Sequence, residues 1–594
     1  MIKRIFKNML LAQIMSSAAV MICMLVDSIM IGQFLGVDAM AAYGLASPLL
    51  FVYTAFGSLV STGIQVVCSK SITRGDKETT NICYTTAIML ALIVSLASLV
   101  VVIVFIDKIC VMLGAEEGTE IFQLTKFYLR GFMFGAPAFL LSQILVPFMI
   151  LSNNRTRLVI AVSLLTVADI VMDIVNVFLM KKGVYGEGFN SVKDGIFGMG
   201  FASALSYYVA LVVAGIYLLS KKCIYKFVIR KFRLRHCFGL IKSGIPTAVN
   251  QLSLSMTTYL INLILLSSGR NEGVAVYSIL ATIGSICYSI GSGIGTVALE
   301  LGGVFYVQED RHSLYELVRV FVKYAVIIDL IVTVIVIGFA GFIMGLFISG
   351  TDDPLVLKLG TYALRVYILC LVSSSLNSSF KNYYLGIEKV KLSELVSVLQ
   401  NFAYVVLAAL ILNALGGVKA IWFAFVIGET LTVFTIAVIA WVKKKKVVIN
   451  SEAFSMLDPD FGVDDKDMVS FPISSFEQVR EACDEAVDFC RGHGGDEQVC
   501  SRLALCIEEM GTNIIKHGFS DGKEHDMQLR VIDKKGSWMI GFMDDCKGFD
   551  PIKYRKKHKF DNSYSRLGLK LVFDAATDVK YVNALGLNNL TIML

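Results

Sequence analysis

The stretch that decides the fold is Thr-Val-Ala-Asp-Ile-Val-Met-Asp-Ile-Val-Asn-Val-Phe-Leu, residues 166–179. Asp169 and Asp173 stand four positions apart in a segment that is otherwise apolar enough to cross a bilayer. Residues at i and i+4 share one face of a helix, so both carboxylates point the same way. A carboxylate near the middle of a membrane is costly unless it is paired, protonated or in a water-filled cavity. These two acids therefore predict a buried site inside a membrane protein.

Asp27 presents the same problem in the first apolar stretch, Leu10–Ile31. Two or three close carboxylates cannot all ionise in a dry cavity, because like charges repel and burial disfavours charge. We therefore expect Asp27, Asp169 and Asp173 to share one cavity and to hold the coupling cation of a transporter. Na⁺ or H⁺ would neutralise the cluster, and its release would free the acids for a cationic substrate. The alternative is that Asp169 or Asp173 only hydrogen-bonds a neighbouring helix.

Composition agrees with a membrane protein that has a soluble part. The chain has 594 residues, of which 56% are apolar and only 17% charged. Soluble proteins average about 25% charged residues, so most of this chain is expected to lie in a membrane. Residues 1–446 carry 36 Lys and Arg against 23 Asp and Glu, whereas residues 447–594 carry 18 against 25. A basic membrane part followed by an acidic part predicts at least two domains.

A bilayer core requires about 20 apolar residues per helix. That length predicts twelve membrane-spanning helices, at about 9–32, 42–67, 82–106, 125–151, 157–180, 196–220, 239–267, 274–300, 318–347, 358–386, 392–415 and 418–442. Basic residues gather in alternate loops, as between Lys221 and Arg235 and at Lys443–Lys446. Because positive loops stay inside, both termini are expected in the cytosol. The lack of a eukaryotic targeting signal favours a bacterial plasma membrane.

The membrane part also contains an internal repeat. Residues 25–46 resemble 260–280, and residues 149–157 resemble 384–391. Two six-helix halves in the same orientation, 1–222 and 238–446, predict a secondary transporter whose path lies at their interface. Asn262 stands where the first half has Asp27, so the ion chemistry is expected in the first half.

Other polar features of the second half receive simpler interpretations. Glu300, Asp329 and Glu429 lie nearer the ends of their predicted spans, where we expect them to reach water. The sequence Gly-Ser-Gly-Ile-Gly-Thr at 291–296 resembles a nucleotide-binding fingerprint but follows no strand, so close packing of helices is its expected role. No Gly-x-x-x-x-Gly-Lys-Ser/Thr motif occurs, and ABC-type pumping therefore has no support.

Three features of the membrane part occur together: Val26-Asp27 with Ile31-Gly32, then Ala-Ala-Tyr-Gly-Leu-Ala-Ser-Pro at 41–48, then Asp173. With them, residues 1–446 resemble the multidrug and toxic compound extrusion (MATE) family. The resemblance implies an all-α membrane protein of two six-helix bundles. It further implies that the protein exports small cationic or amphipathic compounds in exchange for Na⁺ or H⁺.

The resemblance also implies a cation site that contains Asp27 and Asp173. Asp169 stands where the family pattern has an asparagine, and Ser203 stands where it has a threonine. These two departures leave the choice between Na⁺ and H⁺ open. Asn250-Gln251 stands where some members carry a glutamate, which argues against a site in the second bundle.

After Lys446 the composition changes abruptly. We expect a linker over 447–470 and a folded domain over 471–594. Helical patterns occur at 475–491, 496–517 and 567–576, and strand patterns occur at 527–532, 538–543, 579–582 and 590–594. Helices and antiparallel strands in this order predict an α+β two-layer sandwich.

Three motifs of this domain follow one another in a specific order: Glu509-Met-Gly-Thr-Asn513, Asp544-Asp-Cys-Lys-Gly548 and Leu567-Gly568. Together they resemble the GHKL ATP-binding fold, most closely the anti-sigma-factor serine kinases. The resemblance implies bound ATP and Mg²⁺, with Asn513 as the Mg²⁺ ligand, Glu509 as the catalytic base and Asp544 as the acceptor of the adenine amino group. Mg²⁺ that bridges phosphates needs only one or two protein ligands, which agrees with this assignment.

The resemblance implies three further residues of the nucleotide site. Gly548 and Gly568 would let the backbone approach the nucleotide, and Thr591 would support the adenine. A helix that begins at Leu567-Gly568 suits phosphate. Cys546 and Arg566 stand where glycines are expected, so the sequence leaves both ATP hydrolysis and kinase activity open.

Two functions remain. In the first, the chain is a cation-coupled antiporter whose cytosolic domain senses ATP or phosphorylates a partner protein similar to an anti-sigma-factor antagonist. In the second, the membrane part is a receptor that controls a serine kinase. A small-molecule substrate and a lipid bilayer are the expected partners, and no nucleic-acid partner is expected.

Overall fold

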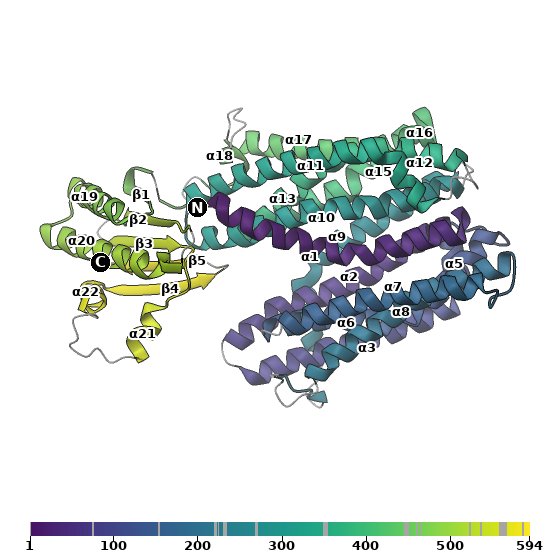
Figure 1. Ribbon diagram of the computed structural model, residues 1–594, viewed down its shortest axis with the longest axis horizontal. Coiled ribbons are helices and arrows are strands. Elements are labelled where there is room, and N and C mark those ends of the chain that lie inside the picture. The colour runs from purple at the N-terminus through teal and green to yellow at the C-terminus, as the bar shows by residue number, and fades with distance from the viewer. Residues whose placement is uncertain are drawn as a thin grey trace.

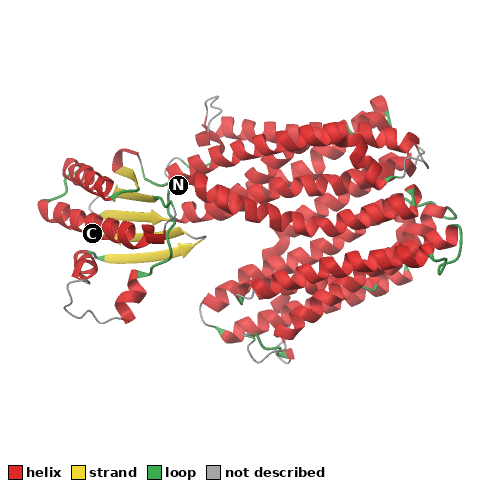
Figure 2. Cartoon of the chain, viewed as in Figure 1, coloured by secondary structure: helices red, strands yellow, loops and turns green. Residues whose placement is uncertain are grey.

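The computed structural model describes residues 2–73, 76–152, 155–218, 223, 225–229, 234–267, 271–348, 354–444, 451–458, 461–463, 465–521, 524–534, 537–557, 567–584 and 587–594. Long helices form the first part of the chain (Figure 1). A small sheet with its own helices lies at one end of them, beside the N-terminus (Figure 2). The two parts correspond to the membrane part and the soluble part that the sequence predicts.

The helices of the membrane part are mostly long and apolar. They are α1 (Ile2–Met30), η1 (Ile31–Leu35), α2 (Val37–Thr73), α3 (Lys77–Val104), α4 (Ile106–Met112), α5 (Glu120–Met133), α6 (Ala136–Leu151), α7 (Arg155–Lys181), α8 (Phe189–Leu218), α9 (Leu234–Ser267), α10 (Asn271–Val307), α11 (Arg311–Phe347), α12 (Pro354–Tyr367), η3 (Ile368–Cys370), α13 (Leu371–Gly386), α14 (Val390–Val398), η4 (Leu399–Ala403), α15 (Tyr404–Gly416), α16 (Val418–Ile421) and α17 (Phe423–Lys444).

Within the described residues, 10 helices are long and apolar enough to cross a membrane. Helices α5 and α6 pass the same test as a pair bent by 52°, which brings the number to 11. The first predicted span, 9–32, coincides with α1 and η1, which together run from Ile2 to Leu35. Each predicted span therefore coincides with a helix or with a helix broken by a short irregular turn.

The two halves meet through helices that pack closely. At Gly63 on α2 a Cβ would collide with the carbonyl of Leu240, and at Gly244 on α9 a Cβ would collide with the carbonyl of Leu59. Glycine at these two positions therefore lets the backbones of α2 and α9 touch. The small residues of 291–296 act in the same way, since a Cβ at Gly291 would lie 2.9 Å from the Cα of Ser375. The prediction that this stretch serves helix packing is confirmed.

Helix α1 belongs to the first half by sequence but packs against the second half at its beginning. Ile2, Phe6 and Leu10 are buried in one cluster with Phe305 of α10 and Phe321 of α11. Farther along, Ser28 shares a hydrogen bond of 3.1 Å with Thr282 of α10. Helix α1 is therefore a connection between the two halves along its length.

The soluble part is a sheet covered on one face by helices. Its elements, after the short helix α18 (Ser451–Phe454), are η5 (Asp465–Asp467), β1 (Met468–Ile473), α19 (Phe476–Gly492), α20 (Glu497–Asn513), η6 (Ile514–Gly518), η7 (Phe519–Asp521), β2 (Met527–Asp533), β3 (Trp538–Asp544), α21 (Pro551–Lys557), α22 (Leu567–Ala575), β4 (Asp578–Ala584) and β5 (Leu587–Met593). The strand order is β1-β2-β3-β5-β4, and all neighbours are antiparallel. The predicted α+β two-layer sandwich is confirmed.

Strand β1 is the one element of this sheet that the sequence analysis missed. It includes Pro472, which lacks a backbone N–H and is found in sheets mainly on edge strands. Here β1 pairs only with β2, with Pro472 opposite Gln528. Because β1 begins at Met468, the last residues of the expected linker, 468–470, belong to the sheet.

The segment that joins the two parts is packed against the membrane helices. Met456 and Leu457 are 2% and 3% exposed. Asp458 accepts hydrogen bonds from Lys389 (2.7 Å) and from Lys443 (2.8 Å). The ring of Phe461 stacks on Tyr306 with 4.8 Å between centroids. These contacts hold the expected linker in place rather than leaving it as a free tether.

A buried ion pair completes the junction. Arg530 on β2 lies 2.8 Å from Asp310, the residue that caps α11, and the two side chains are 8% and 1% exposed. Removing one partner of such a pair leaves an uncompensated buried charge and costs about 3–5 kcal/mol. The sheet is therefore fixed relative to α11.

We expect Asp458→Asn to loosen residues 451–458. The two lysines lower the pKa of Asp458 to about 2. A carboxylate with a lowered pKa stabilises the folded state above its ordinary pKa and loses that contribution only as the pH falls through the lowered value. Hydrogen exchange of residues 453–457 in the wild type should therefore stay slow at about pH 4, and the variant should exchange several-fold faster at pH 7.

Glu481→Gln, at an exposed carboxylate on α19, is the matched control and should leave this exchange unchanged. Equal exchange in all three proteins would contradict the contribution of Asp458.

Candidate functional site

The first half brings the predicted acids together between three helices. Asp27 comes from α1, Asp169 and Asp173 from α7, and Ser203 from α8. Ser203 Oγ donates a hydrogen bond of 3.3 Å to Asp27 Oδ2, and Asp27 interacts electrostatically with both Asp173 and Asp169. Asp169 and Asp173 are 3% and 0% exposed. All four predicted residues of the transport site thus lie in one cluster that faces the protein interior.

Neighbouring contacts fix the orientation of α7, which carries two of the acids. Asn176 Nδ2 donates a hydrogen bond of 2.9 Å to the carbonyl of Gly195, and Tyr185 donates one of 3.0 Å to Asn176 Oδ1. At Gly198 a Cβ would collide with the Asn176 side chain, so α8 needs glycine there. These contacts join α7 to α8 on one side and direct Asp173 toward α1.

Two tyrosines that the sequence analysis did not select also belong to this cluster. Tyr43 and Tyr128 meet edge to face at 5.4 Å, and each interacts electrostatically with Asp27 and Asp169. Tyr43 lies in the motif at 41–48, but nothing in that motif indicates that its ring faces the acids. Both oxygens of Asp173 lack a hydrogen-bond donor among the described residues. The cluster is thus an acidic and largely buried site that could accept a proton or a small cation.

The second half holds two buried acids, which corrects an expectation. Asp329 is 0% exposed and Glu429 is 9% exposed, so both are buried among the helices rather than extended toward the bulk water beyond a span end. The expectation was wrong because α11 begins at Arg311, which places Asp329 about 27 Å along the helix at 1.5 Å per residue. Glu429 accepts hydrogen bonds from Asn377 (2.7 Å) and Gln400 (3.3 Å). Glu300 accepts a hydrogen bond of 3.4 Å from Gln13 and is only partly buried.

A cavity of about 620 Å³ lies between the halves, and Glu429 is in its wall. Residues of α1 and α2 line one side, and residues of α9, α10, α13, η4 and α17 line the other. Its charged lining residues are Lys381, Glu394 and Glu429. Because both halves contribute, this cavity is the candidate path for a solute.

In the soluble domain, the structure brings Glu509 and Gly568 together. Glu509 lies on α20 and Gly568 near the start of α22, and a Cβ at Gly568 would collide with the Glu509 carboxylate. Asn513 is the last residue of α20, about one helical turn beyond Glu509. A glycine at a helix start, a carboxylate and an amide in this order fit the phosphate end and Mg²⁺ of a nucleotide.

A second group surrounds Asp544 at the end of β3. Asn588 of β5 lies opposite Asp544 and donates a hydrogen bond of 2.7 Å to its carboxylate. Tyr581 and Asn583 both donate to Asn588 Oδ1, at 2.6 and 2.7 Å. Burial raises the pKa of Asp544, and the hydrogen bond from Asn588 opposes that shift. Gly548 packs beside the same group, with Asn583 Nδ2 3.1 Å from where its Cβ would be.

Thr591 does not join this group. Side chains alternate between the faces of a strand, so Asn588 and Leu590 share the face of Asp544, whereas Thr591 lies on the opposite face. Asn588 is the residue of β5 that lies beside Asp544, and the support of the adenine by Thr591 stays a prediction. The sequence analysis missed Asn588 because only the register of β5 on β3 decides which residue faces Asp544.

Cys546 does not point into the space expected for the nucleotide. Its N–H donates to Asp544 at 3.0 Å, and its thiol is buried against Gly518, where a Cβ would lie 2.7 Å from the sulfur. Gly518 therefore makes room for the side chain that replaces the expected glycine. Arg566 lies outside the described residues.

One group of possible metal ligands lies at the edge of this domain. His525, Asp545 and Cys546 have ligand atoms within 4.8 Å of one another. Arg4 of α1 lies 2.5 Å from Asp545 and 3.3 Å from Asp526. A guanidinium already balances Asp545, so this group connects the domain to α1 rather than offering an open metal site.

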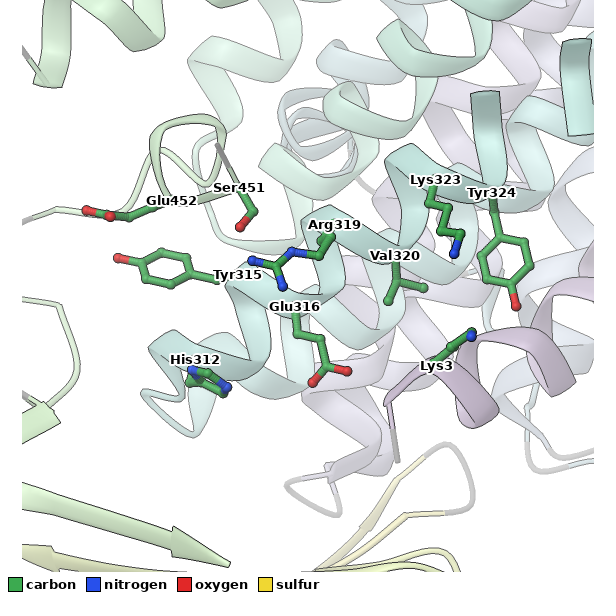
Figure 3. A pocket seen from close by; sticks show the side chains of 10 residues that line it. All are labelled: Lys3, His312, Tyr315, Glu316, Arg319, Val320, Lys323, Tyr324, Ser451 and Glu452. Carbon is green, nitrogen blue, oxygen red and sulfur yellow. The ribbon is translucent and has the colours of Figure 1, made fainter. Parts of the chain in front are cut away.

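A further cavity of about 470 Å³ lies at the junction of α1, α11 and α18 (Figure 3). Lys3 reaches into it from α1, and Arg319 and Lys323 reach in from α11. None of the acids of the transport cluster and none of the nucleotide-site residues lines it. It is therefore separate from both candidate sites.

Comparison with known families and proteins agrees with this two-part organisation. The MatE family model matches residues 12–175 and 246–410, which is more than half of the chain. The model of the histidine kinase-like ATPase domain matches residues 474–593. The chain is similar to the multidrug export protein MepA of Staphylococcus aureus, with 20% identity over 415 residues that cover 69% of this chain and 87% of that protein.

Solved structures share the fold of the membrane part. A multidrug resistance MATE family transporter of the MOP superfamily in an inward-facing conformation matches with a TM-score of 0.64 at 20% identity, over 70% of this chain and 92% of that one. A MOP superfamily transporter from Pyrococcus furiosus, reported to have a binding pocket of reverse polarity, matches with a TM-score of 0.59 at 20% identity, over 73% and 94%.

We predict that Asn588→Ala weakens binding of Mg-ATP to the full-length protein about tenfold, because Asp544 loses the donor that orients it and a hydrogen bond to a charged group contributes about 1.5–3 kcal/mol. Titration with a fluorescent ATP analogue measures the change. Asn589→Ala, at the next residue on the opposite face of β5, is the control and should bind like the wild type. If both variants bind equally well, Asn588 has no part in the site.

Proposed function

Because this chain belongs to the MATE family of multidrug efflux transporters and carries a histidine kinase-like ATPase domain, we propose that it exchanges a small organic compound for Na⁺ or H⁺ across a bacterial plasma membrane. We propose further that ATP binding to the C-terminal domain regulates this exchange. Both termini would then lie in the cytosol, as the distribution of basic loops predicts.

The observation that supports ion coupling most is the cluster of Asp27, Asp169 and Asp173. Three carboxylates, two of them with almost no exposure, cannot all keep a charge at one place inside a membrane protein. Because the three carboxyl groups lie close together, they would have an affinity for a proton or Na⁺. Ser203 and the two tyrosines offer neutral oxygen atoms, which suit either ion.

An exchange follows from this electrostatic cost. If one of the three acids is ionised, the bound ion makes the cluster neutral, and a cationic group gains nothing from it. When the ion leaves, the uncompensated charge attracts a cation, so ion and substrate compete. Asp27 lies on α1, which packs against α10 of the second half, and Tyr43 lines both the cluster and the cavity between the halves. Through these contacts the ionic state of the cluster can affect the cavity that would carry the small cationic or amphipathic compound.

The support for regulation is the position of Arg4. Arg4 lies in the first turn of α1 and binds Asp545, the neighbour of Asp544 in the candidate nucleotide site. Asp27 lies near the other end of the same helix. A change at the Asp544 loop on ATP binding would therefore act on the helix that carries one of the coupling acids.

Two finer assignments stay predictions from the sequence. One is a serine kinase activity, with Glu509 as base and Asn513 as Mg²⁺ ligand, toward a partner protein similar to an anti-sigma-factor antagonist. The other is the division into a transporter domain (1–446), a linker (447–470) and an ATP-binding domain (471–594). ATP would either donate a phosphoryl group or regulate transport simply by being bound. The residues named above would orient the nucleotide.

We predict that Asp173→Asn abolishes cation-coupled flux. The full-length protein in vesicles should move ethidium in response to an imposed Na⁺ or H⁺ gradient, and the variant should fall to the level of protein-free vesicles because the ion no longer balances a charge at this position. Glu187→Gln, at an exposed acid in the loop between α7 and α8, should transport normally. Gradient-driven flux that survives Asp173→Asn would remove the acidic cluster from the coupling mechanism.

We predict that Arg4→Gln uncouples transport from ATP. In the wild type, Mg-ATP on the cytosolic side should change the ethidium flux at least about twofold, and in the variant this response should disappear while the basal flux remains. Lys7→Gln, one turn farther along α1 and exposed, should keep the response. An ATP response of equal size in Arg4→Gln would show that the contact with Asp545 carries no signal.

A further inference from the structure

We propose that the cavity between the halves accepts a zwitterion, with the positive group of the solute against Glu429 and its negative group against Lys381. This inference rests on the proposed export function and narrows its substrate class. The cationic cargo that the family resemblance implies would here carry an anionic group as well.

Glu429 provides a buried carboxyl group that accepts hydrogen bonds from two neutral side-chain amides. Asn377 Nδ2 lies 2.7 Å from Glu429 Oε2, and Gln400 Nε2 lies 3.3 Å from Oε1. These two amides fix the direction of the carboxylate but cannot balance its charge. A buried carboxylate without a cation is unfavourable, so this position attracts the ammonium or similar group of a solute.

Lys381 provides the opposite charge in the same wall. Its Nζ donates a hydrogen bond of 3.4 Å to Asn250 Oδ1, and that oxygen also accepts from Ser397 Oγ and, at 2.8 Å, from Asn401 Nδ2. An ammonium has three N–H donors. Among the described residues no carboxylate lies close enough to form an ion pair with Lys381, so it can donate to the carboxylate or phosphate of a solute.

The two charges do not cancel each other. Lys381 and Glu429 interact electrostatically, but no ion pair joins them in the described part of the chain. A solute with only a positive charge gains from Glu429 and is repelled by Lys381. A solute with only a negative charge gains from Lys381 and is repelled by Glu429. A zwitterion is the class of small solute that satisfies Lys381 and Glu429 at once, and Glu394, the third charged residue of the lining, is a partly exposed second acid that also favours the positive group.

The rest of the cavity suits an amphipathic solute of moderate size, because apolar residues such as Met21, Phe51 and Phe425 form much of its wall. Its volume of about 620 Å³ lies within the range of sites that enclose a small molecule. Neutral hydroxyl and amide groups line the wall, among them Ser47, Thr257, Ser374, Ser378 and Asn401. The π-helical turn η4 carries Gln400 and Asn401, and an irregular turn of this kind often re-aims side chains at a functional site.

Charge-matched probes test the inference on the full-length protein. The probes are 6-aminohexanoate, hexylamine and hexanoate, which share one carbon chain and differ in their charged ends. Equilibrium dialysis of the purified protein with radiolabelled 6-aminohexanoate measures binding, and the other two probes serve as competitors. We expect the zwitterion to bind at least about tenfold more tightly than either competitor.

Single substitutions should shift this preference in opposite directions. Lys381→Met should bind hexylamine better than 6-aminohexanoate, and Glu429→Gln should bind hexanoate better. Lys381→Arg should prefer the zwitterion as the wild type does, which would show that the positive charge and not the fold sets the preference. Lys358→Met, at an exposed lysine of α12, is the control and should also bind like the wild type. Equal binding of the three probes by the wild type, or an unchanged preference in Lys381→Met, would overturn the inference.

The outcome separates this inference from the proposed function. Ethidium flux that depends on Asp173 together with a charge preference that ignores Lys381 would reject the zwitterion site alone. A charge preference that follows Lys381 and Glu429 without any gradient-driven flux would reject export and keep the binding site.

Discussion

The structure depends on one constraint: a carboxylate buried among membrane helices needs a positive partner, a proton or a water-filled space. Asp27, Asp169 and Asp173 meet this constraint as a cluster in the first half, where α1, α7 and α8 converge. Glu429 meets it in the second half beside two amides and in the same cavity as Lys381. Helix α7 is oriented so that the face carrying Asp169 and Asp173 points into the protein interior, where these side chains are 3% and 0% exposed.

Equivalent positions in the two repeated halves carry residues with different roles. Asn262, the counterpart of Asp27, donates a hydrogen bond of 2.9 Å to the carbonyl of Gly44 and so joins the halves instead of binding an ion. The second half has acids at other positions, Asp329 on α11 and Glu429 on α17. The π-helical turns η1, η4 and η6 lie next to Asp27, at Gln400 and after Asn513. Each of the three candidate sites thus has an irregular turn beside it, where an extra backbone residue changes the direction of side chains.

The soluble domain is joined to the transporter by charge and by packing. Arg530 and Asp310 form a buried pair, Arg4 binds Asp545, and Met543 and Leu587 are buried in one cluster with Ile5 and Leu314. The face of the sheet that carries Met543 and Leu587 is the face opposite to α19, α20 and α22, whose core includes Phe542 and Leu590. The sheet therefore lies between the candidate nucleotide-site residues and the surface that contacts the membrane helices. Asp545, which binds Arg4, directly follows Asp544 in the chain.

Sequence alone determined the features that depend on local spacing: the apolar spans, the shared face of Asp169 and Asp173, the helices and four of the five strands of the soluble domain, and the motifs at Glu509, Asp544 and Gly568. These follow from helix and strand periodicity, which acts over a few residues. Tertiary structure decided which distant residues meet. The register of β5 on β3 placed Asn588 beside Asp544, the start of α11 at Arg311 placed Asp329 deep in its helix, and the packing of α13 and α17 placed Lys381 and Glu429 in one cavity. Such meetings depend on the rotation and register of whole elements, which are set by the packing of all their neighbours and leave no signal in the spacing of any one segment.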